Sequence, residues 1–470
     1  MTAQGNGDGA REFDVIVIGT GSGVSIADSA VAAGMTAAIV ESGPFGGTCV
    51  NRGCIPSKQL IHSADVMEII QKAGDFGINA HVDSVDWQKI VSRVASEADT
   101  SAQTIESRYR GQNAVTVFRG EGRFVAHKTM EINGQRITAP MIMIAAGSRP
   151  SVPPIPGIED VPYLTSDEAL RHDMQPQRLI VVGGGFVGIE LAHFYGALGT
   201  DVTIVQRGPT LLPIEDEDVS RRFTDLFRRR HRVILDAETR RVSHANGEIA
   251  LEITTPDGDQ TIRGDTLLLA AGRSPNSDRL DLDKTGVETT PRGLIVVDEY
   301  LETTQPGIWA LGDVVGRYQL KHNANWEWWH ADHNMFGRGP KAAVNYHAMP
   351  HAVFASPQVG AVGLTERQAR EQGIPYVLGT YEYAWTAHGE AIGDTTGFVK
   401  IIAREDGREI LGAHIMGTDA ATLIQDIANG MRIGLTTDAY SQAIYIHPAA
   451  PEVVYRAMRA VPGTAVPPVV

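Results

Sequence analysis

Two strand–turn–helix units with glycine-rich turns constrain the fold of this chain more than any other feature of its sequence. The first begins with an apolar run at residues 13–18, which predicts a buried parallel strand. A Gly-Thr-Gly-Ser-Gly turn (19–23), a helical stretch and a second apolar run at 35–40 follow, and that run ends at Glu41. In such a layout the turn and the helix N-terminus bind a pyrophosphate, and the acidic residue binds ribose hydroxyls. The unit predicts a dinucleotide site, although Val24 occupies the position of the third glycine in the usual G-x-G-x-x-G spacing.

The second unit repeats this pattern in the middle of the chain. An apolar run at 179–182 leads into a complete G-x-G-x-x-G at 183–188, with a helical stretch to about residue 198 and another strand-like run at 201–205. The complete motif in its expected context makes an ordinary strand–turn–helix the weaker interpretation. Two such units in one chain indicate electron transfer between two bound dinucleotides.

The residues after the second unit's second strand bear on the choice of nicotinamide cofactor. No acidic side chain follows Val205, and Gln206 and Arg207 stand there instead. An arginine at this place can pair with a 2′-phosphate, which favours NADPH. The alternative is that Arg207 is a solvated surface arginine.

The only two cysteines, Cys49 and Cys54, lie just after the first unit, within Gly-Gly-Thr-Cys-Val-Asn-Arg-Gly-Cys-Ile-Pro-Ser-Lys (46–58). Three interpretations are open: a redox pair, half of a metal site, or inert thiols packed in the core. Zinc sites usually recruit four Cys or His ligands, and no second cysteine cluster exists. Five residues of ideal helix rise about 7.5 Å, which is too far for a disulfide. A redox pair therefore requires a local distortion of the helix, for which Gly53 is the expected place; buried, inert thiols remain the alternative.

Two further segments of the chain carry polar side chains that could bind a ligand or transfer a proton. Asp313 ends a short strand and can accept hydrogen bonds from a polyol, although Gly-Asp is also common turn chemistry. His447 and Glu452 flank a Pro-containing turn, where the carboxylate can orient the imidazole as a base. An ordinary histidine near a helix N-terminus explains that spacing equally well.

Composition excludes several classes of function. The net charge of −15 gives no case for binding nucleic acid or an anionic membrane. No apolar run reaches about 18 residues, and residues 1–11 do not resemble a signal peptide, so a cytoplasmic location is expected. The Trp- and His-rich segment 323–347 is read as a helix that packs on another domain or subunit rather than as a metal site. The Pro-rich tail at 461–470 is expected to be loose.

From residue 13 to about 460 the chain resembles the FAD-containing pyridine nucleotide–disulfide oxidoreductases. The resemblance rests on the 46–58 segment, the strand ending in Gly312-Asp313, and His-Pro-Ala-Ala-Pro-Glu at 447–452. It implies an α/β fold with two Rossmann-like domains, for FAD and for NAD(P)H, and a C-terminal α+β dimerisation domain. The implied domains are FAD binding with the redox disulfide (1–150), NAD(P)H binding (151–276), a central domain completing the FAD site (277–346) and the interface domain (347–470).

The resemblance also implies the catalytic roles. Cys54 is the charge-transfer thiol that faces the flavin, and Cys49 is the interchange thiol that attacks a small-molecule disulfide. His447 with Glu452 is the acid–base pair, which the other subunit of a homodimer supplies. No metal is expected.

The cofactors implied are FAD and NADPH, with NADH as the alternative. Lys58 is expected beside the flavin N5 and paired with Glu190. The first glycine motif and Glu41 are expected to bind the adenosine part of FAD, Asp313 its ribityl chain, and the second glycine motif the pyrophosphate of the nicotinamide dinucleotide. The residues expected to contact the cofactors are Gly19, Gly21, Gly23, Glu41, Thr48, Lys58, Gly147, Gly183, Gly185, Gly188, Arg207, Gly272 and Asp313.

Within the family the chain is most similar to the mycothione reductases, in the 19–23 turn, Leu-Lys-His at 320–322 and the ending from residue 447. This similarity predicts NADPH-dependent reduction of mycothiol disulfide. Dihydrolipoamide dehydrogenase with NAD⁺, another glutathione-reductase-like enzyme, and a redox-inactive flavoprotein with a binding role are the alternatives. Pro213 occupies the position of a second phosphate-binding arginine, and Arg52 stands where many members have an aliphatic residue.

Overall fold

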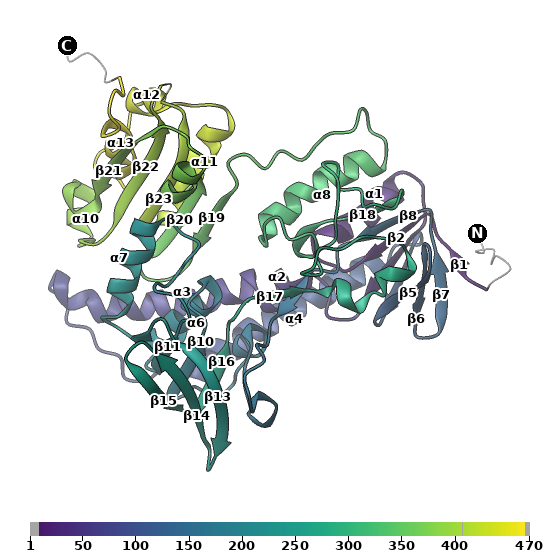
Figure 1. Ribbon diagram of the computed structural model, residues 1–470, viewed down its shortest axis with the longest axis horizontal. Coiled ribbons are helices and arrows are strands. Elements are labelled where there is room, and N and C mark those ends of the chain that lie inside the picture. Colours follow the sequence, from purple (N-terminus) through teal and green to yellow (C-terminus); the bar gives the residue numbers. More distant parts are fainter. Residues whose placement is uncertain (1–8, 407, 466–470) are drawn as a thin grey trace.

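The computed structural model describes residues 9–406 and 408–465. The chain forms an N-terminal unit, a middle unit and a C-terminal unit, each built around its own sheets (Figure 1). The expected mixed α/β architecture with a sheet-rich C-terminal part is confirmed. The tail expected at 461–470 lies partly outside the described residues.

The N-terminal unit contains a five-stranded parallel sheet in the order β18-β8-β2-β3-β4. Val15 and Val17 of the central strand pack under helices, while Ile16 and Ile18 face a second sheet, β1-β7-β6-β5. This two-sided burial explains why the predicted strand is apolar at every position. The elements are β1 (Arg11–Glu12), β2 (Val15–Ile18), β3 (Ala37–Glu41), β4 (Val115–Arg119), β5 (Gly122–Ala126), β6 (Thr129–Ile132), β7 (Gln135–Thr138), β8 (Met141–Ile144), β18 (Ile308–Ala310), α1 (Ser25–Ala32), α4 (Trp87–Arg110) and α8 (Lys321–Met335).

The middle unit repeats the parallel arrangement with four strands in the order β12-β11-β10-β16. A three-stranded antiparallel sheet covers one of its faces and was not predicted from the sequence. A two-stranded ribbon, β9 with β17, links this unit to the first. The elements are β9 (Ser148–Pro150), β10 (Arg178–Val182), β11 (Asp201–Val205), β12 (Arg232–Ile234), β13 (Glu238–Ala245), β14 (Glu248–Thr255), β15 (Gly258–Gly264), β16 (Thr266–Leu269), β17 (Arg273–Pro275), α5 (Ser166–Ala169), α6 (Phe186–Ala197) and α7 (Glu217–Phe227).

The C-terminal unit is an antiparallel sheet in the order β19-β20-β23-β22-β21, and α11 and α13 contribute to its apolar core. All eight residues of β23 are buried. The elements are β19 (Pro350–Val353), β20 (Gln358–Gly363), β21 (Tyr376–Glu382), β22 (Phe398–Arg404), β23 (Ile410–Gly417), α9 (Glu366–Glu371), α10 (Ala387–Ala391), α11 (Ala420–Arg432), α12 (Thr437–Ser441) and α13 (Pro451–Arg459).

The cysteine-containing segment forms two helices, α2 (Gly47–Arg52) and α3 (Cys54–Lys72), separated by Gly53. Gly53 has φ −146° and ψ −116°, so the helix is interrupted between the cysteines, as expected. A Cβ at Gly53 would lie 2.9 Å from the carbonyl oxygen of Thr48, so the break also depends on the absence of a side chain. Short 3₁₀ turns complete the fold: η1 (Ser22–Val24), η2 (Ala73–Phe76), η3 (Ile158–Asp160), η4 (Asn276–Arg279), η5 (Leu282–Lys284), η6 (Gly312–Val314) and η7 (Tyr383–Trp385).

The Trp-rich segment is helical only as far as Met335, where α8 ends. Trp326 packs against the guanidinium of Arg432 in α11, with 4.5 Å between the guanidinium carbon and the ring centroid. This contact joins α8 to the C-terminal unit, whereas Trp329 is 60% exposed.

Two properties of the described residues bear on other classes of function. None of the helices in this part of the chain combines the length and the apolar character needed to span a bilayer. Within the same residues, no group of three or more His, Cys, Asp or Glu side chains is arranged to hold a metal ion.

Candidate active site

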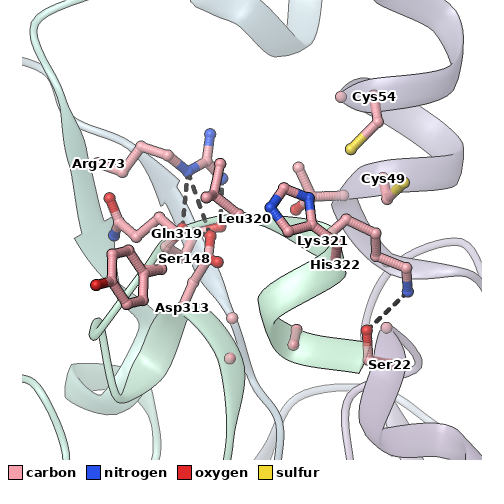
Figure 2. Close-up of a pocket in the computed structure, with 18 of the residues that line it drawn as sticks. Ser22, Cys49, Cys54, Ser148, Arg273, Asp313, Gln319, Leu320, Lys321 and His322 are labelled. Carbon is pink, nitrogen blue, oxygen red and sulfur yellow. Dashed lines mark hydrogen bonds and ion pairs between the residues drawn. The ribbon is translucent and has the colours of Figure 1, made fainter. Parts of the chain in front are cut away.

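A cavity of about 1400 Å³ lies where the three units meet. Of the residues expected to act in catalysis or to contact a cofactor, the cavity is lined by Gly19, Gly21, Glu41, Thr48, Cys49, Cys54, Lys58, Gly147, Gly185, Glu190 and Asp313. The others, Gly23, Gly183, Gly188, Arg207, Gly272, His447 and Glu452, are not among its lining residues. Figure 2 shows the part of the cavity between the cysteines and Asp313.

The first glycine turn packs closely against Ala145, which directly follows strand β8. Gly19 has φ +92°, and a Cβ there would lie 2.3 Å from the carbonyl oxygen of Ala145. A Cβ at Gly23 would lie 2.4 Å from the Cβ of Ala145, whereas Gly21 faces open space. Gly23 therefore provides the close helix–strand approach expected of a third glycine, which explains why Val24 is tolerated.

Glu41, at the end of β3, holds this turn in place. Its Oε2 accepts hydrogen bonds from the backbone N and the Oγ1 of Thr20, at 2.9 and 2.7 Å. Its Oε1 accepts from the backbone N of Gly43 at 2.7 Å. A carboxylate has about four acceptor positions, so Glu41 retains capacity for ribose hydroxyls.

Asp313 belongs to a polar group that the sequence did not reveal in full. Ser148 donates to Asp313 Oδ2 at 2.6 Å, and Arg273 Nε donates to Ser148 Oγ at 2.7 Å and lies 3.7 Å from the same carboxylate oxygen (Figure 2). Ser148 and Arg273 each directly follow a glycine expected to contact a cofactor, Gly147 and Gly272. That adjacency is the only feature of the sequence that pointed to these two residues. The group offers acceptors and donors on one wall, which suits a polyol chain.

The second glycine turn has the geometry of a complete motif. Gly183 has φ +117°, and a Cβ there would lie 2.3 Å from the carbonyl oxygen of Ala270. A Cβ at Gly188 would approach the carbonyl oxygen of Gly183 equally closely, at 2.3 Å. Gln206, which stands in place of an acidic residue, accepts a hydrogen bond from the backbone N of Gly184 at 3.0 Å. Arg207, the next residue, is exposed.

The cysteines face each other across the break between α2 and α3, both as free thiols. The thiol of Cys49 donates a hydrogen bond to Cys54, which lowers the pKa of Cys54 to about 7 against the opposing effect of burial. The charge of Lys58 also lowers the pKa of Cys54. The same hydrogen bond raises the pKa of Cys49. The first negative charge of the reduced pair is therefore carried by Cys54.

Lys58 and Glu190 are brought together in the cavity wall. The Nζ of Lys58 donates to Glu190 Oε2 at 2.7 Å, and the backbone N of Phe354 donates to Glu190 Oε1 at 2.9 Å. The Lys58 Nζ also lies 4.6 Å from the centroid of the Phe354 ring. Because these residues come from α3, α6 and the end of β19, the pair ties the three units together beside the cysteines.

His447 and Glu452 are also brought together, but neither lines the cavity that holds the cysteines of the same chain. The Nδ1 of His447 lies 3.0 and 3.1 Å from the two carboxylate oxygens of Glu452. Burial alone would raise the pKa of Glu452, but the hydrogen bonds with His447 and the backbone N of Ala449 outweigh it and lower that pKa. The His447 side chain is 69% exposed, so an oriented imidazole is presented at the surface of the C-terminal unit.

Arg52 connects the cysteine helix to the middle unit. Its Nη1 lies 3.0 Å from Oδ2 of Asp167 in α5, and both residues line the cavity. This ion pair could not be predicted from the sequence because its partners lie far apart in the chain.

The residues of the first unit fit FAD. The cavity runs from the glycine turn and Glu41 past Asp313 to the cysteines, and its volume exceeds that of a usual small-molecule pocket of about 300–1000 Å³. Gly21 and Gly147 lie on its wall with open space where their side chains would be, so the backbone is accessible to a pyrophosphate.

Comparisons with known proteins agree over most of the chain. Residues 13–327 match the pyridine nucleotide-disulphide oxidoreductase family, and residues 349–458 match its dimerisation domain. The mycothione reductase of Mycobacterium tuberculosis is 39% identical over 95% of this chain and 98% of that protein. A dihydrolipoyl dehydrogenase of Chlamydia muridarum is 34% identical over 94% and 95% of the two chains. The HOCl-induced flavoprotein disulfide reductase RclA of Escherichia coli, solved as a Cu(II) complex, superimposes with a TM-score of 0.86 at 27% identity, over 96% and 99% of the two chains.

The cysteine pair on a cavity between two dinucleotide-binding folds and these matches lead to one conclusion: the chain belongs to the pyridine nucleotide-disulphide oxidoreductases and is an FAD-dependent disulfide oxidoreductase.

Proposed function

We propose that the protein is an NADPH-dependent reductase of mycothiol disulfide that works as a homodimer. The observation that carries the reductase proposal is the Cys49–Cys54 pair at the wall of a cavity bordered by both glycine turns. The substrate is proposed from the 39% identity to the Mycobacterium tuberculosis mycothione reductase.

In this proposal the first glycine turn, Glu41 and Asp313 would hold FAD, which would supply a two-electron path from the nicotinamide to the cysteine pair. The remaining chemistry belongs to the chain. Deprotonated Cys49 attacks the substrate disulfide, so that one S–S bond breaks, a mixed disulfide forms and one substrate thiolate leaves. The Cys54 thiolate then attacks Cys49, which releases the second thiol and restores the intramolecular disulfide. His447 of the partner subunit takes the Cys49 proton and returns it to the leaving thiolate, and one further proton from solvent completes the balance.

A second copy of the chain is needed because the imidazole and the thiols lie apart in one chain. The stretch from Ile433 to His447 contains four large, exposed aliphatic side chains, and such a cluster on a surface usually marks an interface. Their exposed fractions are 76% for Ile433, 37% for Leu435, 101% for Ile444 and 80% for Ile446. We propose that this stretch packs on the partner and carries His447 to the partner's cysteines, as the match of residues 349–458 to a dimerisation domain suggests.

The nicotinamide preference rests on Arg207. It follows β11 directly, where an arginine can meet a 2′-phosphate, while Gln206 is engaged by the glycine turn. Arg207→Gln is expected to raise the KM for NADPH about tenfold and to leave the KM for NADH unchanged, since one charge-assisted contact contributes about 1.5 kcal/mol.

A second candidate function is dihydrolipoyl dehydrogenase with NAD⁺. It is favoured by the 34% identity to the Chlamydia muridarum enzyme and by Pro213 at the position of a second phosphate-binding arginine. A relative named mercuric reductase from Bacillus cereus is 33% identical, but the chain has only the two cysteines of this site and so lacks a second pair for a metal substrate.

The test is a comparison of steady-state rates with NADPH and NADH against mycothiol disulfide, glutathione disulfide and lipoamide. The proposal expects the highest kcat/KM with NADPH and mycothiol disulfide. Cys49→Ser should abolish disulfide reduction while NADPH still bleaches the flavin. A preference for lipoamide with NAD⁺/NADH supports the second candidate, and normal turnover by Cys49→Ser contradicts both.

A further inference from the structure

The Trp- and His-rich segment at 323–347 contains a carboxylate that is fully buried. Glu327, in the second turn of α8, is 0% exposed, and so is Asn323 one turn before it. A charged group at such depth lowers stability unless hydrogen bonds satisfy its oxygens, so the partners of Glu327 indicate its role.

Three donors from different parts of the chain meet this carboxylate. The backbone N of Gly312 donates to Glu327 Oε2 at 2.6 Å. The Nδ2 of Asn323 and the hydroxyl of Tyr346 both donate to Glu327 Oε1, each at 2.9 Å. Asn323 is itself fixed, because its Nδ2 also donates to the carbonyl oxygen of Tyr318 at 3.0 Å. Two side chains therefore orient the carboxylate, and its second oxygen holds Gly312.

The hydrogen bond to Gly312 acts on the turn that carries Asp313. Gly312 has φ +77° and begins η6 after β18, and Asp313 is the next residue. Both line the cavity, whereas Glu327 is not among its lining residues. The Asp313 carboxylate also accepts from Ser148 Oγ at 2.6 Å (Figure 2). Glu327 therefore lies behind the cavity wall and fixes the backbone immediately before Asp313.

The chemistry of the position requires a carboxylate rather than an amide. All three neighbours are donors, and a carboxylate accepts from all of them without presenting a donor of its own. Burial raises the pKa of Glu327 against the three hydrogen bonds, and the charge of Asp313 adds to that rise. A negative charge is thus kept here although its surroundings disfavour it, because the turn needs this acceptor.

We propose that Glu327 is a positioning residue for flavin binding, which holds the Gly312–Asp313 turn so that the Asp313 carboxylate meets the cofactor. The proposal rests on the expected contact of Asp313 with the ribityl chain of FAD, and it does not depend on which disulfide the enzyme reduces. Glu327 makes no contact with the cofactor or the reacting sulfurs: its effect passes through the backbone N of Gly312.

The test is the rate at which the holoenzyme releases FAD. The FAD-loaded protein is diluted to nanomolar concentration, and the rise of flavin fluorescence on release is followed. Glu327→Ala removes the acceptor of Gly312 and is expected to release FAD about tenfold faster, the lower end of the effect of losing a hydrogen bond to a charged group.

Two milder variants separate reach from charge. Glu327→Gln keeps a carbonyl within reach of the Gly312 N but loses the charge, so its release should be at most about threefold faster. Glu327→Asp keeps the charge but is one methylene shorter, so it should release FAD about as fast as Glu327→Ala. The reverse order overturns the proposal, and these two variants carry the test if Glu327→Ala does not fold.

A double-mutant cycle shows whether the effect passes through Asp313. Asp313→Asn keeps an acceptor for Ser148 but loses the charge expected to meet the ribityl hydroxyls, so it should itself release FAD about tenfold faster. If Glu327 acts by placing Asp313, the double variant Glu327→Ala/Asp313→Asn should stay within about twofold of the faster single variant, whereas independent effects would multiply to about a hundredfold.

Asn334→Ala is the matched control for the loss of a buried, hydrogen-bonded side chain in α8. Asn334 is 8% exposed and does not line the cavity. It donates to the carbonyl oxygens of Tyr300 and Ala342 and accepts from the backbone N of Ala342. Its replacement should lower the Tm, as Glu327→Ala does, and leave the release of FAD unchanged.

Unchanged release from Glu327→Ala, or an equal acceleration by Asn334→Ala, overturns the proposal. Multiplying effects in the cycle also overturn it, since Glu327 would then act without Asp313. Unchanged release from Asp313→Asn contradicts the contact of Asp313 with FAD, on which the proposal rests. The reduction of mycothiol disulfide is tested separately by the steady-state rates, so its failure leaves these results unaffected.

Discussion

Replacement of Glu190 by glutamine tests whether the ion pair with Lys58 holds the three units together. The Glu190 side chain is 6% exposed and that of Lys58 is 35% exposed. A hydrogen bond to a charged group contributes about 1.5–3 kcal/mol, and the partly solvated Lys58 reduces this to about 1–2 kcal/mol. The glutamine carbonyl can still accept from the backbone N of Phe354, so the loss is confined to the Lys58 side. We expect the free energy of unfolding to fall by about 1–2 kcal/mol.

The assay is urea denaturation of the holoenzyme, followed by tryptophan fluorescence. Glu131→Gln is the matched control, because its pair with Arg136 spans 3.4 Å and both side chains are well exposed, at 38% and 49%. That exposed pair should contribute less than about 0.5 kcal/mol. Equal effects of the two substitutions would refute the role assigned to Glu190.

Three further predictions follow from the packing and charges. Gly23→Ala should lower the Tm and weaken flavin retention, because the new Cβ would lie 2.4 Å from the Cβ of Ala145. Gly21→Ala should leave the Tm unchanged, because Gly21 faces open space, and equal Tm values for the two variants would contradict the assigned roles. Lys400→Met should lower the free energy of unfolding, measured by urea denaturation, by about 3–5 kcal/mol, because it leaves the fully buried Asp216 without the ammonium 2.8 Å away. A loss no larger than that caused by Lys284→Met, which removes an exposed lysine, would contradict this prediction. Alkylation of the reduced protein should rise through about pH 7 and level off above it, since the thiolate of Cys54 forms above its lowered pKa; a midpoint near 9 contradicts the hydrogen bond from Cys49.

The parts of the fold that local sequence determines were predictable. The apolar run at 13–18 contains β2, and the interruption at Gly53 follows from the spacing of the two cysteines. The antiparallel strands β13–β15 were missed because many of their residues are polar and exposed, so the alternation of apolar and polar residues that predicts a strand is short. The non-helical end of the Trp-rich segment was missed because aromatic density carries no information about where α8 stops.

The candidate site shows the same division. Residues inside recognisable motifs, such as Cys49 and Glu41, were identified, but their partners often were not. Arg52 meets Asp167 and Arg273 meets Ser148 only because the fold joins segments more than 100 residues apart. Such pairs depend on tertiary packing, and a single sequence contains no local pattern that encodes them.

A count of thiols before and after reduction tests the central claim most directly. The oxidised holoenzyme is incubated anaerobically with NADPH, unfolded, and its thiols are titrated. We predict two additional thiols per chain in the unmodified protein and none in Cys54→Ser. Bleaching of the flavin without any gain of thiols would contradict the claim that electrons pass through Cys49 and Cys54.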